Sequence, residues 1–188
     1  MKIKSARNVV LAIAVLVLGS RTGFSQELIK KNAMTLDLAK SIADACQKKA
    51  KDLGYSVAIS VRDEGGNSRV VYRMNDIGSI ALRWAEAKSL TAYENKQSTA
   101  TGEFRIWNIG DQTMVLGVSG GVPLMIDSQI VGAIGVSGAK GKADDIIAEA
   151  GVAVFNDTLK AVQTQQQQTQ PAPAQSQPAS GPSQPEKK

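Results

Sequence analysis

The chain has 188 residues, which is room for one domain of ordinary size, and its 43% hydrophobic and 21% charged residues are typical of a globular protein. It contains no histidine and one cysteine. These two counts exclude a Ser-His-Asp triad, a histidine-based zinc site, an iron–sulfur cluster and an internal disulfide.

The N-terminal segment accounts for most of the formal net charge of +5. Residues 1–25 contain four basic residues, no acidic residue and an unbroken run of ten apolar residues from Val9 to Leu18. This order is typical of a secretory signal peptide, and the run is too short to span a bilayer, which takes about 20 residues. We therefore expect cleavage between Ser25 and Gln26 and a periplasmic or secreted protein, with an uncleaved membrane anchor as the alternative. The 18 basic and 17 acidic residues that then remain argue against nucleic acid as a partner.

The C-terminal segment, residues 163–188, has a composition unlike that of a folded domain. It contains nine Gln and five Pro in 26 residues and almost no apolar side chains. Such a segment buries too little surface to offset its ordering entropy. We expect a disordered Gln/Pro-rich tail, which either is simply solvated or serves as a spacer or partner ligand. The folded domain is then expected at residues 33–162, long enough for one hydrophobic core.

A helix is predicted at the start of this domain. Thr35 is placed to cap a helix that begins at Leu36, apolar residues recur from Leu38 to Leu53 at three- and four-residue spacing, and Gly54 ends the helix. Cys46 lies on the apolar stripe, so we interpret it as a packed side chain and not as a reactive thiol.

A β-hairpin is predicted next. Residues 55–63 and 68–74 have the alternation and the β-branched residues of strands, and a Gly-rich turn separates them. Asp63 and Glu64 could act as acid/base groups, but their position beside the turn favours a structural role.

A second helix is predicted at residues 79–95, capped by Ser79. Trp84, Lys88 and Thr91 share one face of it. A buried lysine can act as a base, as an amine nucleophile or as a clamp for an anion, so Lys88 is the candidate catalytic residue. The alternative, which its position alone favours, is that its stem packs while its ammonium group reaches water.

Glycine is concentrated between Gly110 and Gly141, which hold eight of the 17 glycines in the chain. Strands are predicted within this stretch at residues 114–119, 120–126 and 129–137, and a last helix at residues 144–160. Helix, hairpin, helix, strands and helix in this order predict an α+β fold of the profilin-like or PAS-like kind, with a mainly antiparallel sheet.

Gly132 and Gly135 lie three residues apart in one predicted strand, which would leave little side-chain cover there. Glycine inside a strand marks a bend or a close approach to the backbone. A flat ligand or another subunit could lie against this strand, or the glycines could serve bends and packing; both interpretations stay open. Gly138 precedes the last helix, whose free N–H groups could hold an anion. Asp144 and Asp145 in its first turn are explained more simply by the helix dipole than by metal binding.

Several of these motifs together resemble the GlcG/HbpS-like haem-binding family. The specific part is the pair formed by Gly120-Gly121-Val122-Pro123 and residues 131–138 (VGAIGVSG), followed by Asp144. Other landmarks occur in the same order, namely Asp63-x-Gly65-Gly66, Arg73-Met74 and Lys88-x-x-Thr91-Ala92. The resemblance covers about residues 34–160.

The resemblance implies a five-stranded antiparallel sheet flanked by helices, assembled as a homo-oligomer from dimer to octamer. Some relatives bind haem, some bind iron or act in oxidative stress, and one branch is the C-terminal domain of a cobalamin adenosyltransferase. Family membership thus defines the fold better than the function. The motifs give these candidate ligand-binding residues: Arg73, Met74, Lys88, Thr91, Gly120, Gly121, Pro123, Gly135, Ser137, Gly138 and Asp144.

Haem or another tetrapyrrole is the ligand that the resemblance favours, for an exported binding protein in haem or iron handling or in oxidative stress. Because the chain has no histidine, an axial iron ligand would come from another residue type, with Tyr72, Met74, Tyr93, Met114 and Met125 as candidates by type.

Two other functions stay open. One is a small-molecule enzyme that uses Lys88, with Arg73, Ser137 or Asp144 positioning an anionic substrate. The other is an oligomeric partner-binding module. The sequence assigns no metal ligands.

Overall fold

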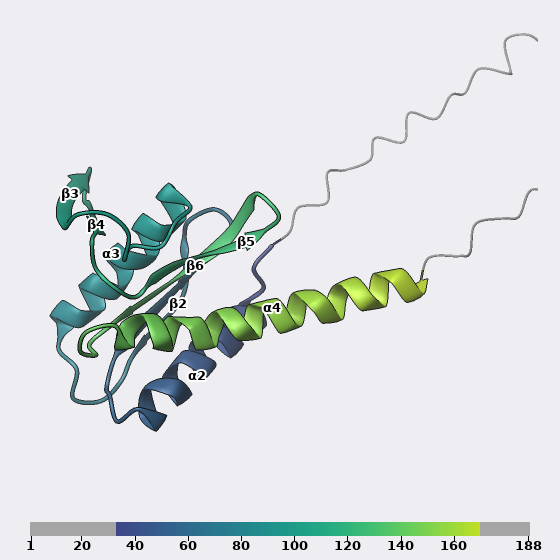
Figure 1. Ribbon diagram of the computed structural model, residues 1–188, viewed down its shortest axis with the longest axis horizontal. Helices are drawn as coiled ribbons and strands as arrows, with labels where there is room; N and C mark the ends of the chain where they lie inside the picture. The colour runs from purple at the N-terminus through teal and green to yellow at the C-terminus, as the bar shows by residue number, and fades with distance from the viewer. Residues whose placement is uncertain (1–32, 170–188) are drawn as a thin grey trace, which may run out of the picture. The chain divides into compact units, whose positions relative to one another are not determined.

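The structure is a computed structural model that describes residues 33–169 (Figure 1). The expected signal peptide and the expected tail from residue 170 onward lie outside the described residues. Within them, no helix is both long enough and apolar enough to cross a membrane.

Two antiparallel sheets form; five of their strands fall in the regions predicted as strands, and the sixth, β3, lies in a stretch for which no strand was predicted. The larger sheet has the strand order β2-β1-β6-β5, and the smaller one pairs β3 with β4. The strand bounds are β1 Ala58–Arg62, β2 Ser68–Arg73, β3 Arg105–Ile109, β4 Gln112–Leu116, β5 Gly121–Ile126 and β6 Gln129–Ser137.

The α+β class is confirmed, but the expected five-stranded sheet is a sheet of four strands in the described part of the chain. β3 and β4 form a separate ribbon because β4 is attached to α3 instead of a sheet edge. The backbone N–H of Val115 donates a hydrogen bond to Oγ1 of Thr91 at 2.8 Å, and Met114, Val115 and Leu116 are buried.

Three helices complete the described fold. α2 (Leu36–Asp52) starts as predicted, with Oγ1 of Thr35 accepting a hydrogen bond from the Leu38 N–H. α3 (Ser79–Asn95) has the predicted bounds, but its N-cap is Gly78 and not Ser79, and no side chain caps it.

The last helix, α4 (Ala143–Thr169), is longer than predicted. It continues past Lys160 into the segment expected to be disordered, so that expectation is wrong for residues 163–169. Glutamine is a good helix former, and extending an existing helix avoids the cost of nucleation.

The helices cover both faces of the four-stranded sheet (Figure 1). α3 packs on one face, against β1, β5 and β6, and α2 and α4 lie together on the other. The β3–β4 ribbon contacts α3 through β4. Because β6 is central and covered twice, all residues from Val131 to Ser137 are buried, as expected for a strand between two layers of helices.

Candidate functional site

Lys88 lies in the interior, where α3, β6 and α4 meet. Its side chain is 5% exposed, and its Nζ donates hydrogen bonds to the Val136 carbonyl oxygen and to Oδ2 of Asp144, both at 2.8 Å. Asp144 is also buried, and its Oδ1 accepts a hydrogen bond from the Ala139 N–H at 3.0 Å. The interpretation in which the ammonium reaches water is therefore wrong, because the first turn of α4 supplies a carboxylate that neutralises it.

Gly120, the residue immediately before β5, also contacts this cluster. Its N–H donates to Oδ1 of Asp145 at 2.6 Å, and its carbonyl accepts from the Val136 N–H at 2.8 Å. Its φ of +108° favours glycine, and a Cβ there would lie 2.8 Å from Cβ of Asp144 and 3.3 Å from Nζ of Lys88. Lys88, Gly120 and Asp144, which the family motifs place far apart in sequence, are thus brought together.

Two more of the predicted residues, Thr91 and Gly121, are held by hydrogen bonds within the protein, and a third, Ser137, is buried. Oγ1 of Thr91 donates to the Ala87 carbonyl at 2.8 Å while it accepts from β4. The Gly121 N–H donates to Oγ1 of Thr99 at 2.9 Å. Ser137 ends β6 and is 9% exposed.

The glycines of β6 allow close packing. A Cβ on Gly135 would overlap the Ala85 carbonyl oxygen and lie 2.6 Å from the Ser89 nitrogen, so the backbone of α3 occupies the space beside this strand. A Cβ on Gly132 would lie 3.1 Å from Cε of Met34. The structure therefore supports the packing interpretation over the ligand-facing one, because α3 covers this strand.

The remaining predicted residues lie elsewhere. Arg73 is exposed and donates to the Ile77 carbonyl at 2.6 Å, and Sδ of Met74 accepts from the Val57 N–H at 3.5 Å. Pro123 is half-buried on β5. A Cβ on Gly138 would lie 2.8 Å from the Ser56 carbonyl oxygen. None of these four lines either of the two cavities described next.

The smaller cavity, about 350 Å³, borders the Lys88–Asp144 pair. Its other lining residues are Trp84, Gly117, Val118, Ser119 and Gly141. The two charged groups that line it already bind each other, so the cavity offers a ligand little unpaired charge. Catalysis by Lys88 stays a prediction. What the geometry shows is a structural contact, in which the ammonium group binds Val136 and Asp144.

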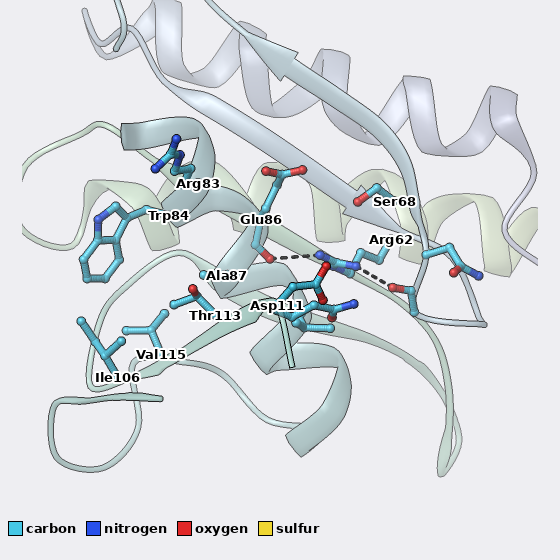
Figure 2. Close-up of a pocket in the computed structure, with 14 residues that line it drawn as sticks. Arg62, Ser68, Arg83, Trp84, Glu86, Ala87, Ile106, Asp111, Thr113 and Val115 are labelled. Carbon is cyan, nitrogen blue, oxygen red and sulfur yellow. Dashed lines mark hydrogen bonds between the residues drawn. The ribbon is translucent and has the colours of Figure 1, made fainter. Parts of the chain in front are cut away.

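A larger cleft, about 660 Å³, lies between α3, the β1–β2 turn and the β3–β4 ribbon (Figure 2). Its apolar lining residues are Trp84, Ala87, Leu90, Ile106 and Val115. Its polar lining residues are Arg62, Asn67, Ser68, Arg83, Glu86, Asp111, Gln112 and Thr113, with Gly66 at the turn. Ligand sites are typically clefts of roughly 300–1,000 Å³ that combine apolar walls with a few polar groups, and this cleft has that composition.

Arg62, at the end of β1, is the buried cation of the cleft, with 9% of the residue exposed. Figure 2 shows its guanidinium between the β1–β2 turn and α3. It donates to the carbonyls of Gly66 (2.6 Å) and Glu86 (3.3 Å) and to Oγ of Ser89 (3.0 Å). These acceptors are neutral, and among the ion pairs of the described residues none involves Arg62. Burial lowers the pKa of Arg62, an effect that more distant carboxylates, Glu86 first, oppose.

The β1–β2 turn that forms one rim of the cleft is fixed in place. Oδ1 of Asp63 accepts from the N–H groups of Gly65 (2.9 Å) and Asn67 (3.0 Å), an Asx-type arrangement. The Tyr93 hydroxyl donates to the Glu64 carbonyl at 2.9 Å, and a Cβ on Gly66 would lie 2.7 Å from Cε1 of the Tyr93 ring. Asp63 thus has the structural role that the sequence favoured.

A family model described as "Haem degrading protein HbpS-like" matches residues 34–153. The chain belongs to the HbpS-like family. This confirms the resemblance that the glycine and lysine motifs indicated, and the domain is referred to below as the HbpS-like domain.

Relatives of the HbpS-like domain occur among both sequences and solved structures. The protein GlcG of Escherichia coli strain K12 is 34% identical over 111 residues, which cover 57% of this chain and 83% of GlcG. A double mutant of Streptomyces reticuli HbpS has a TM-score of 0.57 at 27% identity, covering 68% of this chain and 90% of that one. The PduOC:haem complex has a TM-score of 0.56 at 23% identity, covering 66% of this chain and 96% of PduOC, a likeness that concerns the fold.

Sequence reasoning missed the larger cleft of the HbpS-like domain. Its residues come from β1, the β1–β2 turn, α3 and the β3–β4 ribbon, and no family motif quoted above includes Arg62. One signal was available: Arg62 follows Ala58 and Ser60 at period two in a strand whose other residues are apolar or small, which places a cation on a buried face.

The described residues of the HbpS-like domain contain no cluster of three or more His, Cys, Asp or Glu side chains that could hold a metal ion. The charged groups of the larger cleft, Arg62, Arg83, Glu86 and Asp111, instead mix cations with carboxylates. Such a surface can orient a ligand that is apolar over most of its area and charged at its edge.

Proposed function

We propose that the HbpS-like domain binds a flat, anionic tetrapyrrole, with haem as the first candidate, in the cleft around Arg62. The observation that carries the proposal is the buried Arg62 guanidinium, whose hydrogen-bond partners are all neutral. A buried charge is costly unless a counter-charge pairs with it. An acidic group on a ligand would supply that counter-charge.

The apolar part of the cleft suits the ring of such a ligand. Trp84, Leu90 and Val115 come from α3 and β4, and Ile106 on β3 belongs to the opposite wall and is 51% exposed. Covering apolar side chains with a flat ring contributes about 25 cal/mol per Å² removed from water. An aromatic residue such as Trp84 can also stack on a conjugated ring.

The charged part suits carboxylates at the edge of the ring. A guanidinium binds a carboxylate through two parallel hydrogen bonds, which fixes the orientation of the ligand as well as its charge. Arg62 uses Nε, Nη1 and Nη2 once each for protein acceptors, which leaves two of its five N–H groups for a ligand. Arg83 is exposed at the same cleft and is the second candidate for an anionic group.

The family description and the fold support the choice of haem. The matching family model is named for haem degradation, and PduOC was solved as a haem complex. When bound, haem would supply a conjugated ring, two propionates and a redox-active iron. The residues of the cleft fit the ring and the propionates, and Arg62, Arg83 and the apolar walls would hold them.

A role in haem or iron handling or in the oxidative-stress response, outside the cytoplasm, is part of the proposal. It is supported by the signal-peptide pattern of residues 1–25 and by the family. Mass spectrometry of protein recovered from a producing bacterium tests the export step. A mature chain that begins at Gln26 is expected, and an intact Met1 in the periplasmic or secreted fraction would contradict it.

Titration with haemin tests binding. The wild-type protein is expected to saturate at one haemin per chain with a shift of the Soret band, and Arg62→Met to bind at least about tenfold more weakly, because it loses a charged hydrogen-bond partner. Arg73→Met is the matched control, since Arg73 lies outside the cleft.

Ile106→Glu offers a second test at an exposed position and is expected to weaken binding without affecting folding. The absence of stoichiometric saturation by the wild type would refute the proposal.

A further inference from the structure

The cleft contains none of the side chains that usually ligate haem iron. Iron in haem proteins is held by His nitrogen, by Cys or Met sulfur, or by Tyr oxygen. The lining residues of the cleft include none of these four types, and the whole chain has no histidine. The oxygen atoms that the cleft does offer belong to Glu86, Asp111, Thr113 and the amide and hydroxyl groups of its rim.

None of the sulfur and phenol groups of the described residues lines the cleft. Burial raises the pKa of the Cys46 thiol to about 12, and Cys46 packs in the core between α2 and α4. Met34 and Met114 are 1% and 2% exposed, and Sδ of Met74 accepts a backbone hydrogen bond. These sulfur atoms are therefore not available at the cleft.

The two tyrosines that were candidates by type are also held by the protein. The Tyr72 hydroxyl donates to Oδ1 of Asp44 at 3.0 Å, and the Tyr93 hydroxyl donates to the Glu64 carbonyl at 2.9 Å. Met125, the last candidate, lies on β5 and does not line the cleft. The axial ligands expected by residue type are thus separated from the cleft that fits the ring.

From this separation we infer that the cleft recognises the conjugated ring and its carboxylates and gains little affinity from the central metal. This inference rests on the proposed function and narrows it. The ligand class is a flat dicarboxylate tetrapyrrole with or without iron, bound through Arg62 and the apolar walls. Metal-free protoporphyrin IX should bind nearly as tightly as haemin, whereas its dimethyl ester, which keeps the ring and loses both charges, should bind poorly.

Tryptophan fluorescence gives a readout that does not depend on iron. The chain has two tryptophans: Trp84 lines the cleft and Trp107, on β3, does not. In a Trp107→Phe protein, quenching of Trp84 therefore reports ligand bound beside this residue for all three compounds, and because Trp84 also lines the smaller cavity, a second variant is needed to locate that ligand. Arg62→Met in the same background shows whether the quenching depends on the cation.

The three titrations separate this inference from the function on which it rests. Dissociation constants for haemin and protoporphyrin IX within about fivefold of each other, with the dimethyl ester at least about tenfold weaker, support it. A preference for haemin of more than about fivefold overturns it and leaves the proposed function standing. Equal binding of the dimethyl ester overturns the carboxylate part, and failure of both haemin and protoporphyrin IX to bind overturns the proposed function itself.

Discussion

The two buried cations of this domain, Lys88 and Arg62, are stabilised in opposite ways. Lys88 is neutralised inside the protein, by the Asp144 carboxylate 2.8 Å away, and it joins α3 to α4. Arg62 is also buried, but its three hydrogen bonds go to neutral oxygen atoms and it faces a cleft. The first arrangement is complete without a ligand, and the second is one to which an anion can add.

This contrast separates residues that maintain the fold from residues that serve binding. A buried ion pair that loses one partner leaves an uncompensated charge in a medium of low dielectric constant. When a buried cation whose hydrogen-bond partners are neutral is replaced, no buried carboxylate is left without a counter-ion, so the folded protein loses less stability. The charge of a lysine or arginine therefore does not by itself identify the functional residue; the charge of its hydrogen-bond partners separates these two.

The largest expected effect is the loss of the internal pair. Lys88→Met leaves Asp144 buried without its cation and should lower the free energy of unfolding by about 3–5 kcal/mol. Lys88→Met/Asp144→Leu removes both charges and should be more stable than Lys88→Met. Urea unfolding followed by circular dichroism measures both. Lys48→Met is the control, because the Lys48–Asp52 pair is exposed and should contribute less than about 1 kcal/mol. Similar values for Lys88→Met and Lys48→Met would show that the buried pair is not a structural contact.

The next effect tests the contact between β6 and α3, the helix that carries Lys88. Gly135→Ala would place a methyl group against the Ala85 carbonyl oxygen, and such overpacking should cost about 1–3 kcal/mol or more. At Gly78 an added Cβ meets nothing within 4 Å, so Gly78→Ala should cost less than about 1 kcal/mol, the size of an N-cap effect. Thermal unfolding of the two variants gives the comparison. If Gly135→Ala is as stable as Gly78→Ala, there is room for a methyl group between β6 and α3, and the close packing described above is wrong.

A smaller stability effect and a clear binding effect are expected at Arg62. Arg62→Met should lower the free energy of unfolding less than Lys88→Met does, and the difference should be at least about 1 kcal/mol. The reason is that no buried carboxylate loses its counter-ion in Arg62→Met. Haemin at 100 times its dissociation constant should stabilise the wild type by about 2.7 kcal/mol and the variant by markedly less. Unfolding with and without haemin measures this linkage. Equal stabilisation of the two proteins would place the ligand away from Arg62.

The smallest effect concerns Cys46, whose buried thiol stays protonated because burial disfavours the charged thiolate. Burial raises the pKa of its thiol from 9.0 to about 12. The unfolded chain loses this proton first as the pH rises, so the stability from this group is complete below about pH 9 and declines from pH 9 towards pH 12. The decline is at most about 1.4 kcal/mol per pH unit.

The matched variant for this pH effect is Cys46→Ala. It should be less stable than the wild type near neutral pH because it creates a cavity, but it should lose less stability between pH 8 and pH 10.5. Urea unfolding at both pH values measures the difference. Equal losses in the two proteins would mean that the thiol ionises in the folded state as easily as in the unfolded chain.

Much of the fold could be predicted from sequence because local signals carry it. The Thr35 cap, the hairpin turn and the bounds of α3 and β6 follow from capping, turn and periodicity rules. The separate β3–β4 ribbon could not be predicted, since it depends on the hydrogen bond from Val115 to Thr91 across the fold. The length of α4 was underestimated because the Gln/Pro-rich composition of residues 163–188 predicted disorder, although glutamine itself is a good helix former.

The candidate site was harder to predict than the fold. The motif residues Lys88, Gly120 and Asp144 do meet, but they meet in a contact that the protein satisfies itself. The residues of the larger cleft come from four separate elements, and their proximity is a property of the tertiary structure. Export and oligomeric assembly, which concern residues and copies beyond the described chain, stay predictions.

One wall of the cleft includes a strand of the four-stranded sheet and the other is the two-stranded β3–β4 ribbon, and this difference has a consequence for engineering. Arg62 belongs to β1, which is paired on both sides within the four-stranded sheet, whereas Ile106, Asp111 and Thr113 come from a ribbon of two strands. A library that randomises residues 105–113 would therefore alter the shape of the binding surface while the anion anchor keeps its place. New ligand selectivities could be evolved on this scaffold without rebuilding its core.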